Sequence, residues 1–183
     1  MYTDNTLTPK EAIRLCALGI LSEGPIRYSA LANEVRHFVG HLVGPSIEVL
    51  SPSIELLKYE GLVTPQDGEG MEDDASLHIT EKGKTELHTL LTANLRTGAA
   101  ELNKLIIALK FKFMHFLSKK EQLDQAELLV DVYESALARL INLRQSHSNT
   151  DGYLVIWLDH DIETIESRLN WLTGFRDRLE RQA

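Results

Sequence analysis

The stretch that decides the fold reads Leu50-Ser51-Pro52-Ser53-Ile54-Glu55-Leu56-Leu57-Lys58-Tyr59-Glu60-Gly61-Leu62-Val63, and Leu77-His78-Ile79-Thr80-Glu81-Lys82-Gly83 follows after an acidic loop. The first part predicts a helix that ends at Gly61 and continues into a strand, because glycine readily adopts the left-handed backbone that ends helices. The second part predicts a strand and the start of another helix. This order of elements is typical of a winged helix-turn-helix, in which one helix usually enters the DNA major groove.

The half of the chain that carries this layout is acidic. Residues 1–90 hold 7 Lys+Arg and 14 Asp+Glu, whereas residues 91–183 hold 12 and 13, which together give the net charge of −8. Domains that bind nucleic acid usually have a basic surface, because phosphate contacts supply most of their affinity. The layout therefore predicts DNA binding, whereas the charge argues against an extensive set of phosphate contacts.

Composition places the chain among ordinary globular proteins. With 183 residues, 43% hydrophobic and 25% charged, it is long enough for one large domain or two small ones. No apolar run approaches the roughly 20 residues of a membrane span, and residues 1–4 do not begin a secretory signal. The single cysteine, Cys16, lies in an apolar stretch, so we expect a core residue, no internal disulfide and a cytoplasmic protein.

Three helices are predicted before the first strand. The first spans residues 8–22, where Thr8 and Glu11 have the spacing of a capping box. The second is expected to begin with Ser29 as its cap. The third runs from about Ser46 to Tyr59, and its proline, Pro52, is expected either near the first turn of the better-ordered part or at a kink.

The strands and the rest of the chain complete the prediction. Strands are expected at residues 62–64 and 77–79, and a helix from Thr80 to about Leu95. We place the seam between domains at Thr97-Gly98, which gives a winged-helix domain over residues 1–96 and an α-helical dimerisation domain over residues 97–183. The predicted fold class is therefore mainly α with a small β-hairpin.

The second half is predicted to be helical throughout. After a helix over about residues 99–117, Ser118 and Glu121 form a second capping box at the start of a long helix that ends near Ser146. A last helix is predicted from about Tyr153 to Arg181, and its apolar residues follow a heptad-like spacing typical of coiled coils. Two apolar stripes on this helix indicate two partners, the preceding helix and a second chain. The predicted dimerisation residues are Trp157, Leu158, Ile162, Ile165, Leu169, Trp171 and Leu172.

Six motifs in this order resemble the PadR family of bacterial transcription regulators, in its AphA-like branch. They are Leu18-Gly19-Ile20-Leu21-Ser22-Glu23-Gly24-Pro25, Ser51-Pro52-Ser53-Ile54, Leu57-Lys58-Tyr59-Glu60-Gly61-Leu62, His78-Ile79-Thr80-Glu81-Lys82-Gly83, Phe113-Met114-His115-Phe116-Leu117 and Asn170-Trp171-Leu172. The resemblance covers nearly the whole chain. It implies a DNA-binding regulator in which the reading helix and the wing touch DNA and the C-terminal helices form a swapped, antiparallel dimer.

The sequence departs from the family pattern where the family touches DNA. Ser51 replaces a tyrosine, and Glu55 and Leu56 stand where basic residues are usual. No Lys or Arg occurs between Val63 and Glu81. The resemblance therefore supports dimerisation more strongly than it supports DNA contact.

Serine and glutamate side chains in the third helix can contact phosphates and base edges, and nearby cations can contact phosphates. The predicted DNA-binding residues are Arg27, Tyr28, Ser46, Glu48, Ser51, Ser53, Glu55, Lys58, Lys82 and Lys84. The expected partners are double-stranded DNA and a second copy of the chain, with room for a small-molecule or protein effector. The alternative is an interaction module that binds a protein or small effector and has weak or no DNA binding.

Other patterns carry weaker functional readings. His37 and His41 have helical spacing for a shared metal ion, but no third ligand is apparent, so we predict no metal and no cofactor. The segment Lys110-Phe111-Lys112-Phe113, together with Lys119-Lys120, could form a nucleic-acid or anion patch. We instead expect its phenylalanines to pack between the two domains and its lysine heads to stay in water. Nucleophile elbows and phosphate loops are absent from the sequence, so an enzyme is not expected.

Overall fold

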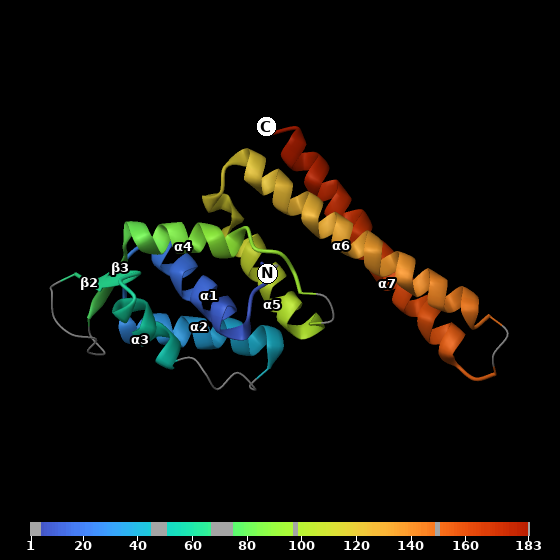
Figure 1. Ribbon diagram of the computed structural model, residues 1–183, viewed down its shortest axis with the longest axis horizontal. Helices are drawn as coiled ribbons and strands as arrows, with labels where there is room; N and C mark the ends of the chain where they lie inside the picture. Colours follow the sequence, from blue (N-terminus) through green and yellow to red (C-terminus); the bar gives the residue numbers. More distant parts are fainter. Residues whose placement is uncertain (1–4, 45–50, 67–74, 97–98, 149–150, 183) are drawn as a thin grey trace. The chain divides into compact units, whose positions relative to one another are not determined.

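The computed structural model describes residues 5–44, 51–66, 75–96, 99–148 and 151–182 (Figure 1). The chain forms two compact units, residues 1–116 and 117–183. The elements of the first unit are α1 (Pro9–Glu23), β1 (Ile26–Arg27), α2 (Tyr28–Val43), α3 (Ser51–Tyr59), β2 (Val63–Pro65), β3 (Ser76–Ile79), α4 (Glu81–Leu91), α5 (Ala100–Phe113) and the 3-10 turn η1 (Met114–Phe116). The second unit holds α6 (Lys119–Ser146) and α7 (Leu154–Glu180).

The first unit confirms the predicted winged helix and adds one strand to it. The two predicted strands pair as the antiparallel β2 and β3, with Val63 opposite Ile79. On its other edge β3 pairs antiparallel with β1, where Ile26 lies opposite Leu77. The sheet order is therefore β1-β3-β2, a three-stranded sheet rather than the predicted hairpin alone. The predicted acidic loop at residues 67–74 lies outside the described residues.

Helix α1 begins directly after the capping residue predicted from the sequence, whereas α2 begins before its predicted cap. Thr8 accepts a hydrogen bond from the Glu11 N–H at 3.3 Å, and the Glu11 carboxylate accepts from the Thr8 N–H at 2.7 Å, so the capping box is confirmed. The expected cap at Ser29 is wrong, because α2 already begins at Tyr28. The Tyr28 N–H donates to the Ala75 carbonyl at 3.0 Å, so pairing with the sheet sets the start of α2.

Helix α5 packs with the winged helix. A Cβ atom on Gly19 would overlap the ring of Phe113. The Phe113 side chain of α5 therefore packs directly against the backbone of α1 at this glycine. Phe113 is fully buried, and Cys16 is buried in the same core, where burial raises the pKa of its thiol to about 12. The boundary between the compact units therefore falls after η1, whereas the sequence-based boundary lay at residues 96 and 97.

The expectation that the lysine heads near Phe113 stay in water is wrong for Lys110. Its side chain is fully buried, and its ammonium donates to the Leu91 and Ala93 carbonyls at 2.6 and 2.7 Å. These carbonyls lie at and just beyond the end of α4, where backbone acceptors lack helical partners. Lys110 therefore caps α4 from α5, and burial lowers the pKa of its ammonium to about 8.

The second unit is a hairpin of two long helices. The Ser118–Glu121 capping box begins α6 as predicted, with the Ser118 N–H donating to the Glu121 carboxylate at 2.9 Å. Helix α7 packs along α6, and Leu158 and Leu172 of its heptad-like stripe are buried within the single chain. Within the described ranges, no helix combines the length and the apolar character needed to cross a membrane.

Candidate nucleic-acid interface

Helix α3 buries one face and turns the other toward solvent. Ile54 and Leu57 are fully buried in the first unit. Helical geometry places Glu55, Leu56 and Tyr59 on the opposite side, since residues three and four apart share a face. All three are exposed, Leu56 by 47% and Tyr59 by 91%. We call Glu55, Leu56 and Tyr59 the outward face of α3.

The C-terminal end of α3 is closed by a Schellman motif at Gly61. The Leu62 N–H donates to the Leu57 carbonyl at 2.8 Å, and the Gly61 N–H donates to the Lys58 carbonyl at 2.9 Å. Gly61 has φ +71°, a left-handed conformation that favours glycine. Leu57 and Leu62 are both buried, which supplies the apolar contact that accompanies this motif. The predicted glycine stop is therefore confirmed.

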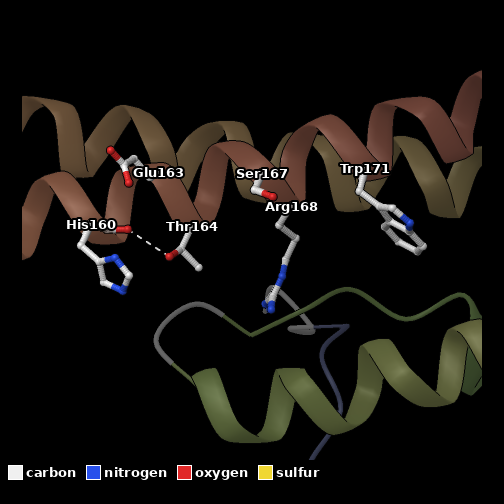
Figure 2. Close-up of a pocket in the computed structure, with 6 residues that line it drawn as sticks. All are labelled: His160, Glu163, Thr164, Ser167, Arg168 and Trp171. Carbon is white, nitrogen blue, oxygen red and sulfur yellow. Dashed lines mark hydrogen bonds between the residues drawn. The ribbon is translucent and has the colours of Figure 1, made fainter.

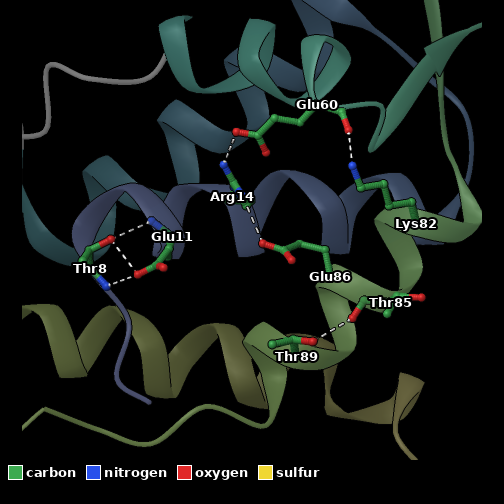
Figure 3. Close-up of polar contacts among 8 residues, drawn as sticks. All are labelled: Thr8, Glu11, Arg14, Glu60, Lys82, Thr85, Glu86 and Thr89. Carbon is green, nitrogen blue, oxygen red and sulfur yellow. Dashed lines mark hydrogen bonds and ion pairs between the residues drawn. The ribbon is translucent and has the colours of Figure 1, made fainter. Parts of the chain in front are cut away.

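The segment Thr80-Glu81-Lys82-Gly83 then holds the remaining carbonyls at this end. The Thr80 hydroxyl donates to the Gly61 and Leu62 carbonyls at 2.8 and 3.1 Å, and the Thr80 N–H donates to the Leu62 carbonyl at 3.0 Å. The Lys82 ammonium donates to the Glu60 carbonyl at 2.7 Å (Figure 3). A Cβ atom on Gly83 would collide with the Leu62 carbonyl oxygen, so glycine is required there. We call the Thr80, Lys82 and Gly83 contacts the clamp.

A side-chain ion pair reinforces the clamp from α1. The Arg14 guanidinium donates to the Glu60 carboxylate at 2.8 Å and to the Glu86 carboxylate at 3.0 Å, which links α1 and α4 to the residue that follows α3 (Figure 3). Burial lowers the pKa of Arg14, but the hydrogen bonds and charges of Glu86 and Glu60 outweigh it, and the pKa is raised overall. The end of α3 is thus fixed to both neighbouring helices.

The predicted DNA-binding residues lie in different environments. Ser46 and Glu48 lie outside the described residues, and the side chains of Ser51 and Ser53, in the first turn of α3, are not described either. Tyr28 is largely buried, whereas Arg27 is exposed at the end of β1.

The three predicted lysines also differ from one another. Lys58 is half-buried at the end of α3. Lys82 contacts the Glu60 carbonyl in the clamp, and Lys84 pairs with Glu81 at 2.7 Å on the surface. Phosphate contact by these residues stays a prediction, and Lys82 already has a structural role.

Sequence reasoning missed Arg14 and the structural role of Gly83. The motif around Thr80 predicted a strand and a helix start, but it gave no sign of the close backbone approach between Gly83 of α4 and Leu62, which directly precedes β2. Arg14 gave no signal, because its partners lie 46 and 72 positions away in the sequence. Only the fold brings these residues together.

Helix α7 exposes a separate aromatic surface. Trp157 and Trp171 are 57% and 54% exposed, and Ile156 is exposed nearby. His160, Thr164, Arg168 and Trp171 project from one side of α7 (Figure 2). Arg168 donates to the Tyr133 hydroxyl at 3.0 Å, which joins α7 to α6. The tryptophan pair therefore lies outside the stripe that packs against α6.

The two histidines considered as metal ligands lie on α2. Their ring centroids are 4.2 Å apart, and His41 Nδ1 lies 2.8 Å from the His37 carbonyl oxygen. No group of three or more His, Cys, Asp or Glu side chains suited to a metal ion occurs in the described part of the chain.

This geometry, a three-helix core with a β2–β3 wing and a third helix presented to solvent, defines the winged helix-turn-helix class. Over residues 2–176 the sequence matches the family described as "Putative AphA-like transcriptional regulator". The chain belongs to this AphA-like family of transcription regulators.

Solved structures of similar proteins include two of Bacillus subtilis PadR and one of a Streptococcus mutans protein. Bacillus subtilis PadR in complex with p-coumaric acid is 17% identical, with 92% of this chain and 99% of that chain covered and a TM-score of 0.39. The same protein with operator DNA is 19% identical, with 91% and 96% covered and a TM-score of 0.37. The protein smu.1604c from Streptococcus mutans UA159 is 17% identical, with 92% of this chain and 98% of that chain covered and a TM-score of 0.38. Curated protein sequences gave no match.

Proposed function

We propose that this transcription regulator binds double-stranded DNA as a homodimer. Each protomer would place α3 in the major groove, with the two helices about one turn of DNA, roughly 34 Å, apart. The observation that carries the proposal is α3 itself, whose inner face is buried and whose outward face is presented by the clamp. Membership of a family of transcription regulators supports DNA as the partner.

The charge around α3 predicts modest affinity. Of the α3 side chains that the structure describes, Ile54 to Tyr59, the only cation is Lys58, and it lies half-buried. Lys84 is paired with Glu81, and Lys82 contacts a backbone carbonyl. Since phosphate neutralisation supplies most non-specific affinity, we expect binding that is weak at about 150 mM salt and measurable at about 50 mM.

The tryptophan pair on α7 supports the second copy as the partner of that surface. Each tryptophan leaves more than half of its surface exposed in the single chain. Burying a large apolar side chain is worth about 2–3 kcal/mol, so covering this pair in both protomers would stabilise a dimer substantially. In the predicted dimerisation set, Leu158 and Leu172 are already covered within the chain, and Ile162, Ile165 and Leu169 are half-buried. Trp157 and Trp171 are the most exposed members of the set, so we expect them to contribute most to the dimer.

A salt titration of DNA binding tests the DNA part of the proposal. For the wild type, log affinity should fall with log salt, and each phosphate contact contributes about 0.9 to the slope. Lys58→Ala removes two contacts from a dimer and should flatten the slope by about 1.8. Lys120→Ala, at an exposed position in the second unit, is the matched control and should leave the slope unchanged.

Two results would contradict the proposal. A slope that responds to Lys120→Ala and not to Lys58→Ala would move the DNA surface away from α3. A wild type that binds no member of a random duplex pool at about 50 mM salt would favour the alternative of a protein- or effector-binding module.

Analytical ultracentrifugation at micromolar concentration tests the dimer. The wild type should sediment at twice the 20.7 kDa of one chain. Replacing Trp157 and Trp171 by serine should give the monomer mass, whereas Tyr59→Ser, which removes a still more exposed aromatic side chain from the first unit, should not. A wild-type monomer would refute homodimerisation.

A further inference from the structure

The outward face of α3 has an unusual composition for a helix in its position. Glu55 is acidic, Leu56 is aliphatic and Tyr59 is aromatic, and no cation shares this face among the described side chains. Single exposed apolar residues are common on protein surfaces and by themselves indicate nothing. Leu56 and Tyr59, however, are three positions apart, so they lie side by side on the face that the clamp turns outward.

The side-chain types on this face limit which bases the helix can recognise in the major groove. Guanine is read mainly by Arg or Lys donating to its O6 and N7 atoms, and the outward face offers neither. Thymine presents a C5 methyl group in the major groove, and apolar side chains recognise that methyl by contact. Glutamate can accept from the amino group of cytosine, so Glu55 is compatible with the same groove.

We propose that Leu56, flanked by Tyr59, reads thymine methyl groups in the major groove, so that this regulator selects its sites by apolar contact with thymine. The proposal rests on the DNA binding proposed above and adds the chemical feature that is recognised. The Schellman motif and the clamp hold α3 through its backbone carbonyls and leave the Leu56 side chain exposed. Contact with a methyl group needs no charge, which fits the acidic character of residues 1–90.

Replacement of thymine by deoxyuridine provides the test, because the two bases differ only in the C5 methyl group. Sites are first selected by the full chain from a random duplex library at about 50 mM salt. Each thymine of a selected site is then replaced singly, and wild-type affinity is measured. At one or more positions the replacement should weaken binding about fourfold, the factor that corresponds to burying one carbon.

Three variants assign the effect to one side chain. Leu56→Ala should bind thymine and deoxyuridine sites equally, whereas Leu56→Met, which conserves volume, should keep the preference. Leu143→Ala removes a comparably exposed leucine from α6 and should behave as the wild type. Leu56 is half exposed, so the thermal unfolding midpoint of Leu56→Ala should stay close to that of the wild type.

The outcomes separate this inference from the proposed function. If the wild type binds DNA but tolerates deoxyuridine at every position, thymine reading is refuted while DNA binding stands. A thymine preference that persists in Leu56→Ala would also refute the role of Leu56. A wild type that binds no duplex would overturn both proposals and leave the outward face to a protein partner.

Discussion

Helices α3 and α7 are held in opposite ways. Helix α3 has nine residues, a length at which an isolated helix is marginal in water, and it is fastened at its C-terminal end by donors that bind the carbonyls of Glu60 and Gly61, directly after the helix. Helix α7 has 27 residues and is held along its length by apolar side chains that pack on α6. The difference teaches that the short helix depends on polar contacts at one end in addition to the buried side chains of Ile54 and Leu57, whereas the long helix spreads its stability over many apolar contacts.

The largest expected effect comes from breaking the clamp with Gly83→Ala. The added Cβ atom would collide with the Leu62 backbone oxygen and lie 2.7 Å from Ile79 Cγ1, and a backbone atom cannot move away as a side chain can. We expect a loss of about 3 kcal/mol or more in the free energy of unfolding. Urea unfolding followed by far-UV circular dichroism measures it.

Two glycines serve as controls for this change. A Cβ atom on Gly40 in α2 or on Gly174 in α7 would meet nothing within 4 Å. Alanine at either position should therefore stabilise its helix, by up to about 1 kcal/mol. A Gly83→Ala protein as stable as the wild type would show that the backbone approach between α4 and β2 is not needed.

The next largest effect is a change of stability with pH. It extends the comparison to α4, whose C-terminal carbonyls accept hydrogen bonds from the Lys110 ammonium. Burial lowers its pKa to about 8, below the 10.5 of an unfolded lysine, so between these values the unfolded chain binds more protons. The free energy of unfolding should therefore rise with pH across this window, by on the order of 2 kcal/mol. Lys110→Met should remove this rise, and Lys104→Met, at an exposed position of the same helix, should keep it.

The measurement is urea unfolding at closely spaced pH values from 7 to 11. Other groups titrate there too, so the decisive quantity is the difference between the wild type and Lys110→Met. A difference that does not change with pH would contradict the assignment of the rise to Lys110.

Replacing Arg14 tests whether a side-chain ion pair matters as much as the backbone contacts. Arg14→Met removes donors to Glu60 and Glu86 but keeps much of the aliphatic stem. Since all three side chains are partly exposed, we expect a loss of only about 1 kcal/mol by urea unfolding. Breaking the surface pair of Lys84 with Glu81 by Lys84→Ala should cost about 0.5 kcal/mol or less. An Arg14→Met loss as large as that of Gly83→Ala would reverse the expected order.

Effects of similar, small size come from the matching capping boxes in the two units. Thr8→Ala at α1 and Ser118→Ala at α6 should each cost about 1 kcal/mol or less, because each removes one acceptor at a helix start. Both tryptophans lie on α7, so tryptophan fluorescence reports the second unit. We expect Ser118→Ala to shift the fluorescence transition more than Thr8→Ala does. Equal shifts would show that the two units unfold together.

Local signals let the sequence predict much of the fold. Both capping boxes, the glycine stop at Gly61 and the two strands of the wing depend on residues within a few positions of one another, and all were confirmed. Of the two positions predicted for Pro52, the structure has the one near the start of α3.

What the sequence did not reveal depends on distant pairing. Strand β1 has only two residues and exists through its partner β3, so no periodicity marks it. The start of α2 is set by the Ala75 carbonyl, which overrides the capping tendency of Ser29. Lys110 has the composition of a surface residue, and its burial follows from carbonyls 17 and 19 positions earlier. The outward face of α3 could not be identified from the sequence, because it depends on which side of the helix the core buries.

The clamp has a consequence for how this regulator can change its targets. Its donors bind carbonyl oxygens, which every amino acid possesses, and they make no demand on the side chains at positions 55, 56 and 59. The side chains at those three positions can therefore be replaced while α3 keeps its position in the fold. New recognition properties can be acquired there one residue at a time, by natural divergence or by design.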